Sequence, residues 1–501
     1  MSSLANANQA KGNLGAVTTT AAKFVMENGG TLNTTAAVTN GSPIKFESEQ
    51  GGVINNSADF IVDRSMSGTV MTKRGGGWMK LNTSNPSLQR MVIAEGTVQC
   101  INANMPAAAV EYQGGTLREN TGSSYPVSVA EYKKGTWYMA NRSTYTNKVT
   151  GKGELTVYCI TEKGSNYYAT RTPVQCNFSD FEGTLVPTSS QDDPVKLRFT
   201  LNVSGGMPKG TMKIADKVEV QNSGRLFHIG RLEGDGALGG SCTFSNGASV
   251  GANTWQVGND DNWTTNVKVT ANANLAKVGA GKVTWAAAND NTGTTTVTEG
   301  ELAVNNSTML GTGVLTVAAD GKLSGYNKTT NALKNSSVIV NGTLRPGLLT
   351  LNSMIFDSKP VRVNETGVLE FNVSGCATAT TNGGTSLEGI STLTVNGTIR
   401  IVPSATNTLK VGDSIRIFRA NTFAGTPKFE MLNGITWDTS RISEGLLFVK
   451  AIEAGIDSIV SEQSPANIYD LRGRLVRANA VTTEGLAPGI YVSRGRKFVI
   501  K

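Results

Sequence analysis

Two stretches lying 204 residues apart carry one pattern: Lys277–Val304, KVGAGKVTWAAANDNTGTTTVTEGELAV, and Lys73–Cys100, KRGGGWMKLNTSNPSLQRMVIAEGTVQC. They align without a gap. The shared polar and glycine positions are Lys73 with Lys277, Gly75 with Gly279, Gly77 with Gly281, and Glu95-Gly96 with Glu299-Gly300. The apolar positions keep the same offset: Met79 with Val283, Leu81 with Trp285, Ile93 with Val297, and Val98 with Leu302. Such internal similarity predicts a repeat architecture.

The repeated unit indicates short strands joined by tight corners. Gly279 and Gly281 allow a corner with unusual backbone angles. Val283 and Trp285 then alternate with polar residues, which is typical of a half-buried strand. After a polar loop, the TVTEGELAV segment directs its apolar residues inward and Thr296 and Thr298 outward; the inward residues are Val297, Leu302 and Val304.

Shorter copies of a G-x-L or G-x-G-x-L rung recur along the chain. They begin at Gly151, Gly234, Gly313, Gly321 and Gly342. One such rung cannot bury its apolar side alone, whereas rungs stacked in register share one continuous core. We therefore predict an all-β fold, a right-handed parallel β-helix over about residues 10–450.

The composition agrees with a solenoid. Length alone suggests roughly three compact domains, but a solenoid grows without enlarging its core. Glycine provides 57 of the 501 residues, charged residues 17% and aromatic residues 6%. This balance favours many short strands and turns.

The segment Leu275–Gly281, followed by TTTVTEGELAV and then Thr343–Gly347, resembles the autotransporter-associated β-strand repeat. Trp285 in place of leucine and Thr294 in place of a second glycine depart from that pattern. The stretches Gly412–Ile415 and Trp437–Ser440 are similar to the last coil of such passengers. The resemblance covers about residues 255–450 and weakly 60–120. We therefore expect an irregular region of degenerate repeats over residues 1–254 and regular repeats with a terminal coil over 255–450.

The composition of the sequence changes after Lys450. Residues 451–465 have the composition of a linker, and 466–501 predict a small C-terminal β-sandwich module. This module closely resembles the C-terminal sorting domain of type IX secretion substrates. The matching residues are Tyr469, Asp470, Gly473, Arg474, Leu486, Gly489, Ile490, Tyr491 and Lys501.

The second resemblance implies export from a Gram-negative cell, with the type IX secretion machinery as a partner and an extracellular or cell-surface location. The first residues of this chain show no secretory signal peptide. The net charge is +8, and Leu471–Lys501 carries seven Lys or Arg against one acid, Glu484. The rest of the chain is nearly neutral, so we expect no nucleic-acid partner. No stretch reaches the ~18–20 apolar residues of a membrane span, so we do not expect an integral membrane protein.

The sequence holds little that suggests catalysis. Its single histidine, His228, lies in an apolar strand pattern, which favours a packed or surface-strand role over a catalytic triad. No GxSxG, HExxH or phosphate-loop motif occurs. We therefore predict no catalytic residue and no enzyme. The five cysteines form no CxxC pair and favour buried free thiols, with one or two disulfides as the alternative: Cys100, Cys159, Cys176, Cys242 and Cys376.

Two acidic pairs are candidates for a ligand site. They are Asp192-Asp193 and Asp260-Asp261, and the second lies between Trp255 and Trp263. Carboxylates bind Ca²⁺ and indole rings stack on sugars, so these four residues form a candidate ligand patch. The same NDDN stretch also reads as an ordinary turn, and we expect no cofactor or metal. Of the remaining tryptophans, Trp78 and Trp285 are expected to pack in rungs and Trp437 to cap the last coil.

The function predicted from these features is adhesion or display at the cell surface, with a glycan or matrix ligand. Affinity would come from repeated shallow contacts. A polysaccharide lyase or hydrolase on the same fold is the enzymatic alternative. A purely structural spacer is the third.

Overall fold

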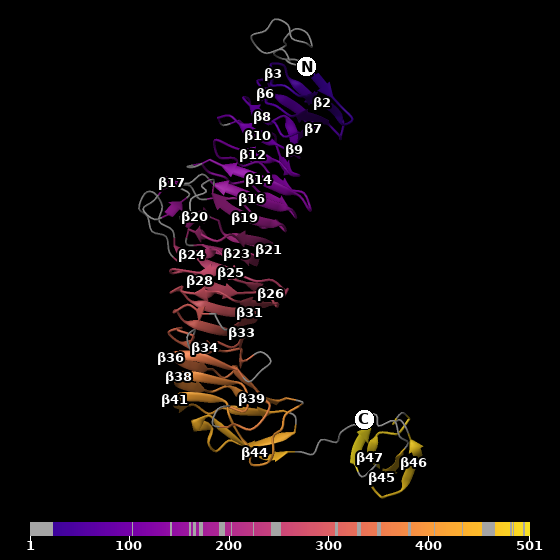
Figure 1. Cartoon of the computed structure of the whole chain (residues 1–501), viewed down its shortest axis with the longest axis vertical. Helices are drawn as coiled ribbons and strands as arrows, with labels where there is room; N and C mark the ends of the chain where they lie inside the picture. Colours follow the sequence, from indigo (N-terminus) through magenta and orange to yellow (C-terminus); the bar gives the residue numbers. More distant parts are fainter. Residues whose placement is uncertain are drawn as a thin grey trace.

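The computed structural model describes residues 24–452 and 466–500, except for 103, 141–142, 160–161, 164–166, 170–173, 190–195, 202, 224, 242–251, 306–308, 328–331, 348–351, 379–381, 405, 433, 481–482, 484 and 494–495. Strands account for 59% of it, and parallel sheets wind into a β-solenoid of about 14 turns (Figure 1). The predicted solenoid fold is therefore confirmed. Within the described ranges, no helix is long and apolar enough to cross a membrane.

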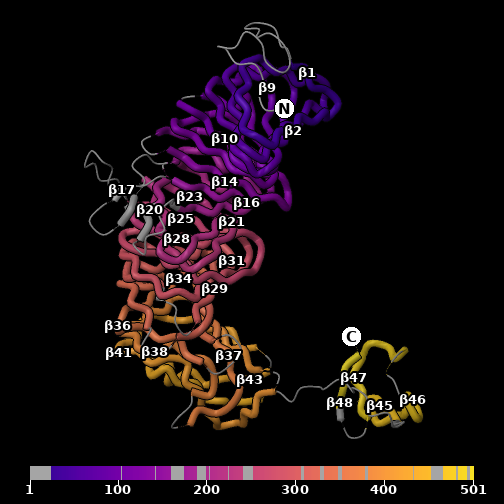
Figure 2. The backbone as a smooth tube through the Cα atoms, turned by 45° about the horizontal axis from the view of Figure 1, so that its top comes forward, coloured from indigo at the N-terminus to yellow at the C-terminus, as the bar shows by residue number. Residues whose placement is uncertain are grey.

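The N-terminal coils contribute a nine-stranded parallel sheet: β1 (Phe24–Met26), β2 (Gly30–Thr34), β4 (Ile44–Phe46), β5 (Gly52–Asn56), β7 (Met66–Arg74), β9 (Leu88–Ile93), β11 (Val110–Tyr112), β13 (Val127–Val129) and β15 (Val149–Gly151). The tube in Figure 2 shows how the coils continue from this end of the chain into the later ones.

A second set of parallel strands continues along the solenoid, with one coil placed on the next. It comprises β3 (Val38–Asn40), β6 (Phe60–Val62), β8 (Trp78–Leu81), β10 (Thr97–Cys100), β12 (Thr116–Arg118), β14 (Lys134–Met139), β16 (Glu154–Cys159), β19 (Thr184–Ser189), β21 (Gly205–Ile214), β23 (Leu226–Gly234), β25 (Thr254–Val257), β26 (Trp263–Thr265), β28 (Asn274–Lys277), β29 (Lys282–Trp285), β31 (Thr295–Val304), β33 (Leu315–Gly325), β34 (Val338–Val340), β35 (Thr343–Pro346), β36 (Ser353–Val363), β37 (Val368–Val373), β38 (Ser386–Val395), β39 (Thr398–Pro403), β41 (Phe418–Ala424) and β42 (Lys428–Met431).

Smaller sheets complete the coils. One contains β17 (Glu162–Lys163), β18 (Tyr167–Ala169), β20 (Lys196–Leu201), β22 (Val218–Asn222), β24 (Ala237–Ser241) and β27 (Lys268–Val269), and β30 (Ala288–Asn289) pairs with β32 (Met309–Leu310). The last coil ends in an antiparallel sheet of β40 (Ser414–Arg416), β44 (Leu446–Ile452) and β43 (Ile435–Asp438), with a 3-10 turn, η2 (Ile442–Glu444). Trp437 is buried in this terminal sheet.

The inward register follows the sequence pattern. Val283, Trp285 and Val297 are fully buried, whereas Thr298 is exposed. The equivalent Met79, Leu81 and Ile93 are fully buried as well. Coils pair residues 19 or 20 positions apart where the repeat is regular, as in Trp78 with Thr97, Thr97 with Thr116, and Thr116 with Thr136. Because side chains alternate across a strand, this stacking gives one continuous apolar core.

A buried lysine stabilises the corner of each repeated unit. The Nζ atom of Lys277 donates to the carbonyl oxygens of Val278 at 3.0 Å, Gly279 at 2.7 Å and Glu299 at 2.9 Å. Lys73 donates in the same way to Arg74 at 2.8 Å, Gly75 at 2.6 Å and Glu95 at 3.2 Å. Each lysine therefore joins its own corner to the next coil. We call these two arrangements the lysine clasps.

Glycine is required beside each clasp. Gly300 has a φ of +65°, and an added Cβ would lie 2.4 Å from the carbonyl oxygen of Gly279. Gly96 has a φ of +67°, and its added Cβ would lie 2.3 Å from the carbonyl oxygen of Gly75. These left-handed angles and close approaches explain why both units contain a Glu-Gly pair.

The C-terminal module is a four-stranded antiparallel sheet with a core of its own. Its strands are β46 (Leu475–Ala480), β45 (Ala466–Asp470), β47 (Gly489–Ser493) and β48 (Arg496–Ile500), drawn in yellow in Figure 1. Ile468, Tyr491 and Phe498 form the buried centre. The described residues of the module form this one sheet, and most of the predicted linker lies outside them.

Candidate functional site

The tryptophans of the predicted ligand patch are part of the solenoid wall. Trp255 is fully buried in β25, and its Nε1 donates to the carbonyl oxygen of Gly239 at 2.9 Å. Trp263 in β26 is 6% exposed, and its Nε1 donates to Oδ1 of Asn259 at 3.2 Å. Because both rings are enclosed, neither offers a face on which a sugar can stack.

The polar residues between these tryptophans form hydrogen bonds within their own turn and to the neighbouring coil. Asp260 Oδ1 accepts from the backbone N–H of Ala280 at 3.1 Å, and Asn259 Oδ1 accepts from that of Asp261 at 3.1 Å. Asn262 Oδ1 accepts from the N–H of Lys282 at 2.7 Å. The turn interpretation accounts for these contacts.

The histidine, the other acidic pair and the cysteines were the remaining candidate groups in the sequence. His228 in β23 is half-buried, with Nε2 2.8 Å from the carbonyl oxygen of Gly258. Among the described residues, no group of three or more His, Cys, Asp or Glu side chains is arranged to hold a metal. Asp192, Asp193 and Cys242 lie outside the described residues. Free thiols occur at Cys100, Cys159 and Cys176, which are buried, and at Cys376, which is exposed.

A distinctive outward face lies on strands β8 to β16. Four strands carry a threonine at the same register position, because Thr97 pairs with Thr116, Thr116 with Thr136, and Thr136 with Thr156. All four are half-buried. Their hydroxyl-bearing positions therefore repeat at the spacing of neighbouring strands, about 4.8 Å.

A column of aromatic and guanidinium groups runs beside the threonines. The rings of Tyr138 and Tyr158 are stacked, with centroids 4.5 Å apart and planes at 9°. The guanidinium carbon of Arg118 lies 4.2 Å from the ring centroid of Tyr138 and 5.6 Å from that of Trp78. Such cation–π stacking holds long side chains in order. We call this surface the aromatic–threonine face; it comprises Trp78, Thr97, Thr116, Arg118, Thr136, Tyr138, Thr156 and Tyr158.

The packing role predicted for Trp78 is wrong. Trp78 is 36% exposed, lies in register with Thr97, and its ring is near the guanidinium of Arg118. The reason is strand parity: Met79 and Leu81 point inward, so Trp78 must point outward. Sequence reasoning missed the whole face, although a signal exists in the triplets TVQ, TLR, TWY and TVY that begin at Thr97, Thr116, Thr136 and Thr156.

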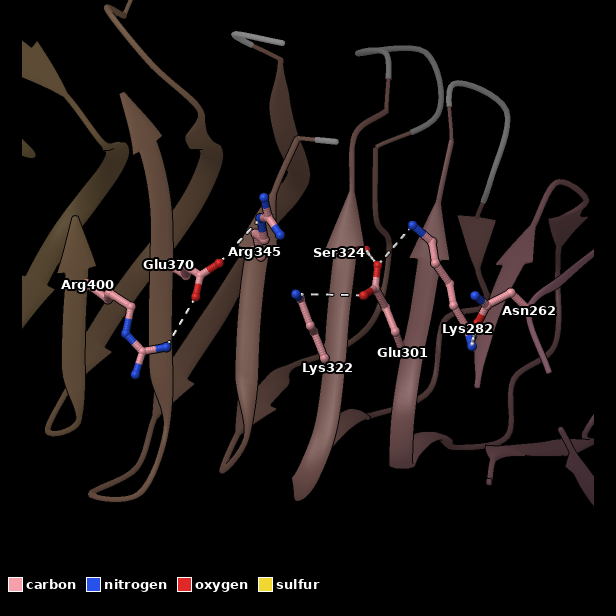
Figure 3. Close-up of polar contacts among 8 residues, drawn as sticks. All are labelled: Asn262, Lys282, Glu301, Lys322, Ser324, Arg345, Glu370 and Arg400. Carbon is pink, nitrogen blue, oxygen red and sulfur yellow. Dashed lines mark hydrogen bonds and ion pairs between the residues drawn. The ribbon is translucent and has the colours of Figure 1, made fainter. Parts of the chain in front are cut away.

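Later coils carry a ladder of alternating charge at corresponding outward positions (Figure 3). Glu301 Oε atoms lie 3.1 Å from Nζ of Lys282 and 3.7 Å from that of Lys322. Glu370 pairs with Arg345 at 3.4 Å and Arg400 at 3.1 Å. Each acid is thus held between two cations. Glu430 pairs with Arg400 alone, at 2.9 Å, among the ion pairs of the described residues. We call this set the charge ladder; it comprises Lys282, Glu301, Lys322, Arg345, Glu370, Arg400 and Glu430.

A cleft near β10 and β12 contains an enclosed carboxylate. Its volume is about 180 Å³, and Cys100, Glu119 and Ser123 are among its lining residues. Glu119 accepts from the Tyr125 hydroxyl at 2.7 Å and from Trp137 Nε1 at 2.6 Å. Burial raises the pKa of Glu119 to about 7, although these donors act in the opposite direction. The carboxyl group therefore titrates near neutral pH beside a solvent-connected cleft.

The predicted sorting residues have clear local roles in the C-terminal module. Asp470 Oδ1 accepts from the backbone N–H groups of Arg472 at 2.9 Å and Arg474 at 3.0 Å, and its Oδ2 pairs with Nε of Arg474 at 2.8 Å. Gly473 takes a φ of +77° in this turn. These bonds lower the pKa of Asp470, chiefly through the Arg474 N–H.

The remaining motif positions divide between core and surface. Tyr491 is buried against Phe498 at 5.7 Å, and Leu486 packs against the same core. Tyr469 is half-buried in β45, and Gly489 pairs with Ile500. Ile490 is 42% exposed. Lys501 lies outside the described residues.

Comparison with known proteins adds no family assignment. No family model matches the chain, and no curated protein matches it. The solenoid fold and its surfaces are therefore the basis for the functional argument.

Proposed function

We propose that this chain is an extracellular, surface-displayed adhesin that binds glycan or matrix polymers through the aromatic–threonine face. The observation that supports this most is the in-register repetition of Thr97, Thr116, Thr136 and Thr156 beside an ordered aromatic column. A polymer lying along this face would meet a threonine hydroxyl on four successive coils, beside Arg118 and the stacked tyrosine rings. Weak contacts repeated in this way add up to useful affinity.

The terminal module supports the proposed location through its resemblance to type IX sorting domains. We infer that Ile468–Lys501 addresses the protein to that machinery. Deleting this segment from the native gene should trap the protein in the periplasm. Normal surface display of the deletion variant would contradict the assignment.

Binding is tested on arrays of glycans and matrix polymers with the whole chain. The double variant Tyr138→Ala/Tyr158→Ala removes the stacked pair and should weaken binding at least tenfold, as expected when about 1.4 kcal/mol is lost. Lys322→Ala, an outward change on the charge ladder, is the matched control and should bind as wild type does. Equal binding by all three proteins would exclude this face as the ligand site.

The enzymatic alternative, a polysaccharide lyase or hydrolase, has one specific feature in its favour. Glu119 has a pKa near 7, as a general acid requires. The described lining of its cleft contains no second carboxylate and no basic residue, whereas glycoside hydrolysis ordinarily uses two carboxylates. We expect no new reducing or unsaturated ends from pectin, alginate, glycosaminoglycans or glucans. Turnover that Glu119→Gln abolishes would establish the enzyme instead.

A further inference from the structure

A second cleft lies at the terminal coil, far along the chain from the aromatic–threonine face. Its volume is about 300 Å³, and it is lined by Gly389, Ile390, Arg416, Arg419, Ala420, Asn421 and Glu444. This volume is at the lower end of the range for small-molecule sites, about 300–1,000 Å³. It has room for one sugar residue or its substituent and not for a folded partner.

The charges around this cleft are unequally matched. Glu444 pairs with Arg441, through Nε at 2.8 Å and through Nη2. Arg419 pairs with Glu388 at 3.2 Å. Among the described residues, Arg416 makes no ion pair, and its Nη1 donates only to the backbone carbonyl of Glu444, at 2.8 Å. Arg416 is thus the cation in the cleft whose charge no carboxylate contacts.

Two further facts describe the surroundings of the Arg416 charge. Its side chain is half-buried, so water screens it incompletely. Burial, followed by the nearby Arg419, lowers the pKa of Arg416, although the charges of Glu388 and Glu444 act in the opposite direction. A guanidinium presents paired N–H groups that match two oxygens of a carboxylate or sulfate.

We propose that this cleft binds an oxyanion substituent of an acidic polysaccharide, with Arg416 as the residue that contacts it. The inference rests on the proposed function and extends it, since it assigns a second contact point and a charge to the glycan. Uronate carboxylates and sulfate esters share the required chemistry. A neutral glycan would gain nothing from Arg416.

The test uses the whole chain with three immobilised polymers: polygalacturonate, dextran sulfate and unmodified dextran. Wild type should bind one or both acidic polymers more tightly than dextran, and less tightly as salt increases. Arg416→Gln should weaken acidic binding about tenfold or more, because the charge-assisted hydrogen bonds to the oxyanion are lost. The control Arg90→Gln removes an exposed arginine that already pairs with Glu111 at 3.0 Å and should leave binding unchanged.

A gain of affinity separates this role from a loss of folding. Glu444→Gln removes the carboxylate beside the cleft and releases Arg441, so acidic polymers should bind more tightly. Unchanged acidic binding by Arg416→Gln, or equal losses in Arg416→Gln and Arg90→Gln, would overturn the inference. Binding to dextran alone would also overturn it while leaving the adhesin proposal intact. If the protein binds no polymer on this panel or on the arrays, both the oxyanion inference and the adhesin proposal are wrong.

Discussion

The two repeated units are nearly the same inside and different outside. Both bury apolar rungs, and both contain a lysine clasp with the same three kinds of carbonyl acceptor. Outside, the first unit presents Trp78 and Thr97, whereas Lys282 and Glu301 occupy the matching positions of the second. Stacking constrains the inward positions of every coil, and it leaves the outward positions free to acquire separate roles.

The two regions also differ in the burial and the pKa of their carboxyl groups. Glu119, in the earlier coils, is enclosed and its pKa is raised by burial. Glu301, in the later coils, is partly exposed; burial acts to raise its pKa, but hydrogen bonds from Ser324 and Lys282 lower it overall. One acid is therefore tuned to titrate near neutrality and the other to stay charged.

Among the substitutions that compare the two units, loss of a lysine clasp should lower the free energy of unfolding most. Lys73→Met and Lys277→Met keep the buried stem but leave carbonyl oxygens without their donor. Each should lower the free energy of unfolding by about 3 kcal/mol, measured by urea denaturation. Similar losses are expected because the two geometries match. A large effect in one unit and none in the other would show that the clasps are not equivalent.

The pH dependence of the clasps has a defined sign. Burial lowers the pKa of each lysine to about 8, against 10.5 when unfolded. Between these values the unfolded state binds more protons, so each lysine makes stability rise with pH. The deficit of Lys277→Met relative to wild type should therefore widen from pH 8 to pH 10.5. A deficit that narrows over this range would contradict the assignment.

Glu119 should affect the pH dependence of stability in the direction opposite to that of the two lysines, and Glu119→Gln should remove this effect. The folded carboxyl stays protonated up to about pH 7, while the unfolded one ionises near 4.5. The folded state binds more protons over this interval, so this group makes the free energy of unfolding fall as pH rises, by up to about 3 kcal/mol.

Denaturation at pH 5 and pH 7.5 measures this change, and Glu119→Gln should lack it. Glu301→Gln is the matched control. Because the pKa of Glu301 is lowered, its contribution is present above the unfolded pKa and is lost only in more acid solution. Identical profiles for wild type and Glu119→Gln would show that Glu119 is not enclosed.

The charge ladder should make the smallest contribution. Glu370→Gln interrupts the pairs with Arg345 and Arg400, which are partly exposed. It should cost about 1 kcal/mol at low salt, since ion pairs near the surface contribute little. The cost should shrink as salt is added, as followed by thermal melting. Thr116→Val, on the aromatic–threonine face, should show no such salt dependence. A salt-independent loss in Glu370→Gln would indicate packing rather than charge.

The features of the fold that depend on strand periodicity could be predicted from the sequence. The solenoid, the inward rungs and the glycine corners follow from local alternation and from one alignment. The expectation that Trp78 packs in a rung is wrong, because the parity of Met79 directs Trp78 outward. Trp255 and Trp263, expected in a ligand patch, are enclosed. At these positions the strand register, and not the aromatic residue type, decides whether the side chain is enclosed.

The remaining features arise from contacts between coils. The cleft at Glu119 requires Tyr125 and Trp137 to converge on one carboxylate. The cleft at Arg416 requires the terminal sheet to turn back on the last coil, where Glu444 accepts its hydrogen bond. Residue spacing within one coil contains no signal for either arrangement.

The central claim is that outward and inward positions alternate through stacked coils, and one pair of adjacent substitutions tests it. Val297→Asp would bury an unpaired carboxylate in a fully enclosed site and should cost several kcal/mol, about 4 or more. Thr298→Asp should cost about 0.5 kcal/mol or less, as at an ordinary surface site. In a solenoid the damage stays local.

Limited proteolysis of the two variants is the direct measurement. Val297→Asp should be cut first within about residues 280–310, leaving the flanking coils as folded fragments, while Thr298→Asp should resist as wild type does. Equal resistance of the two variants, or earlier cleavage of Thr298→Asp, would contradict the register on which the solenoid and its outward faces depend.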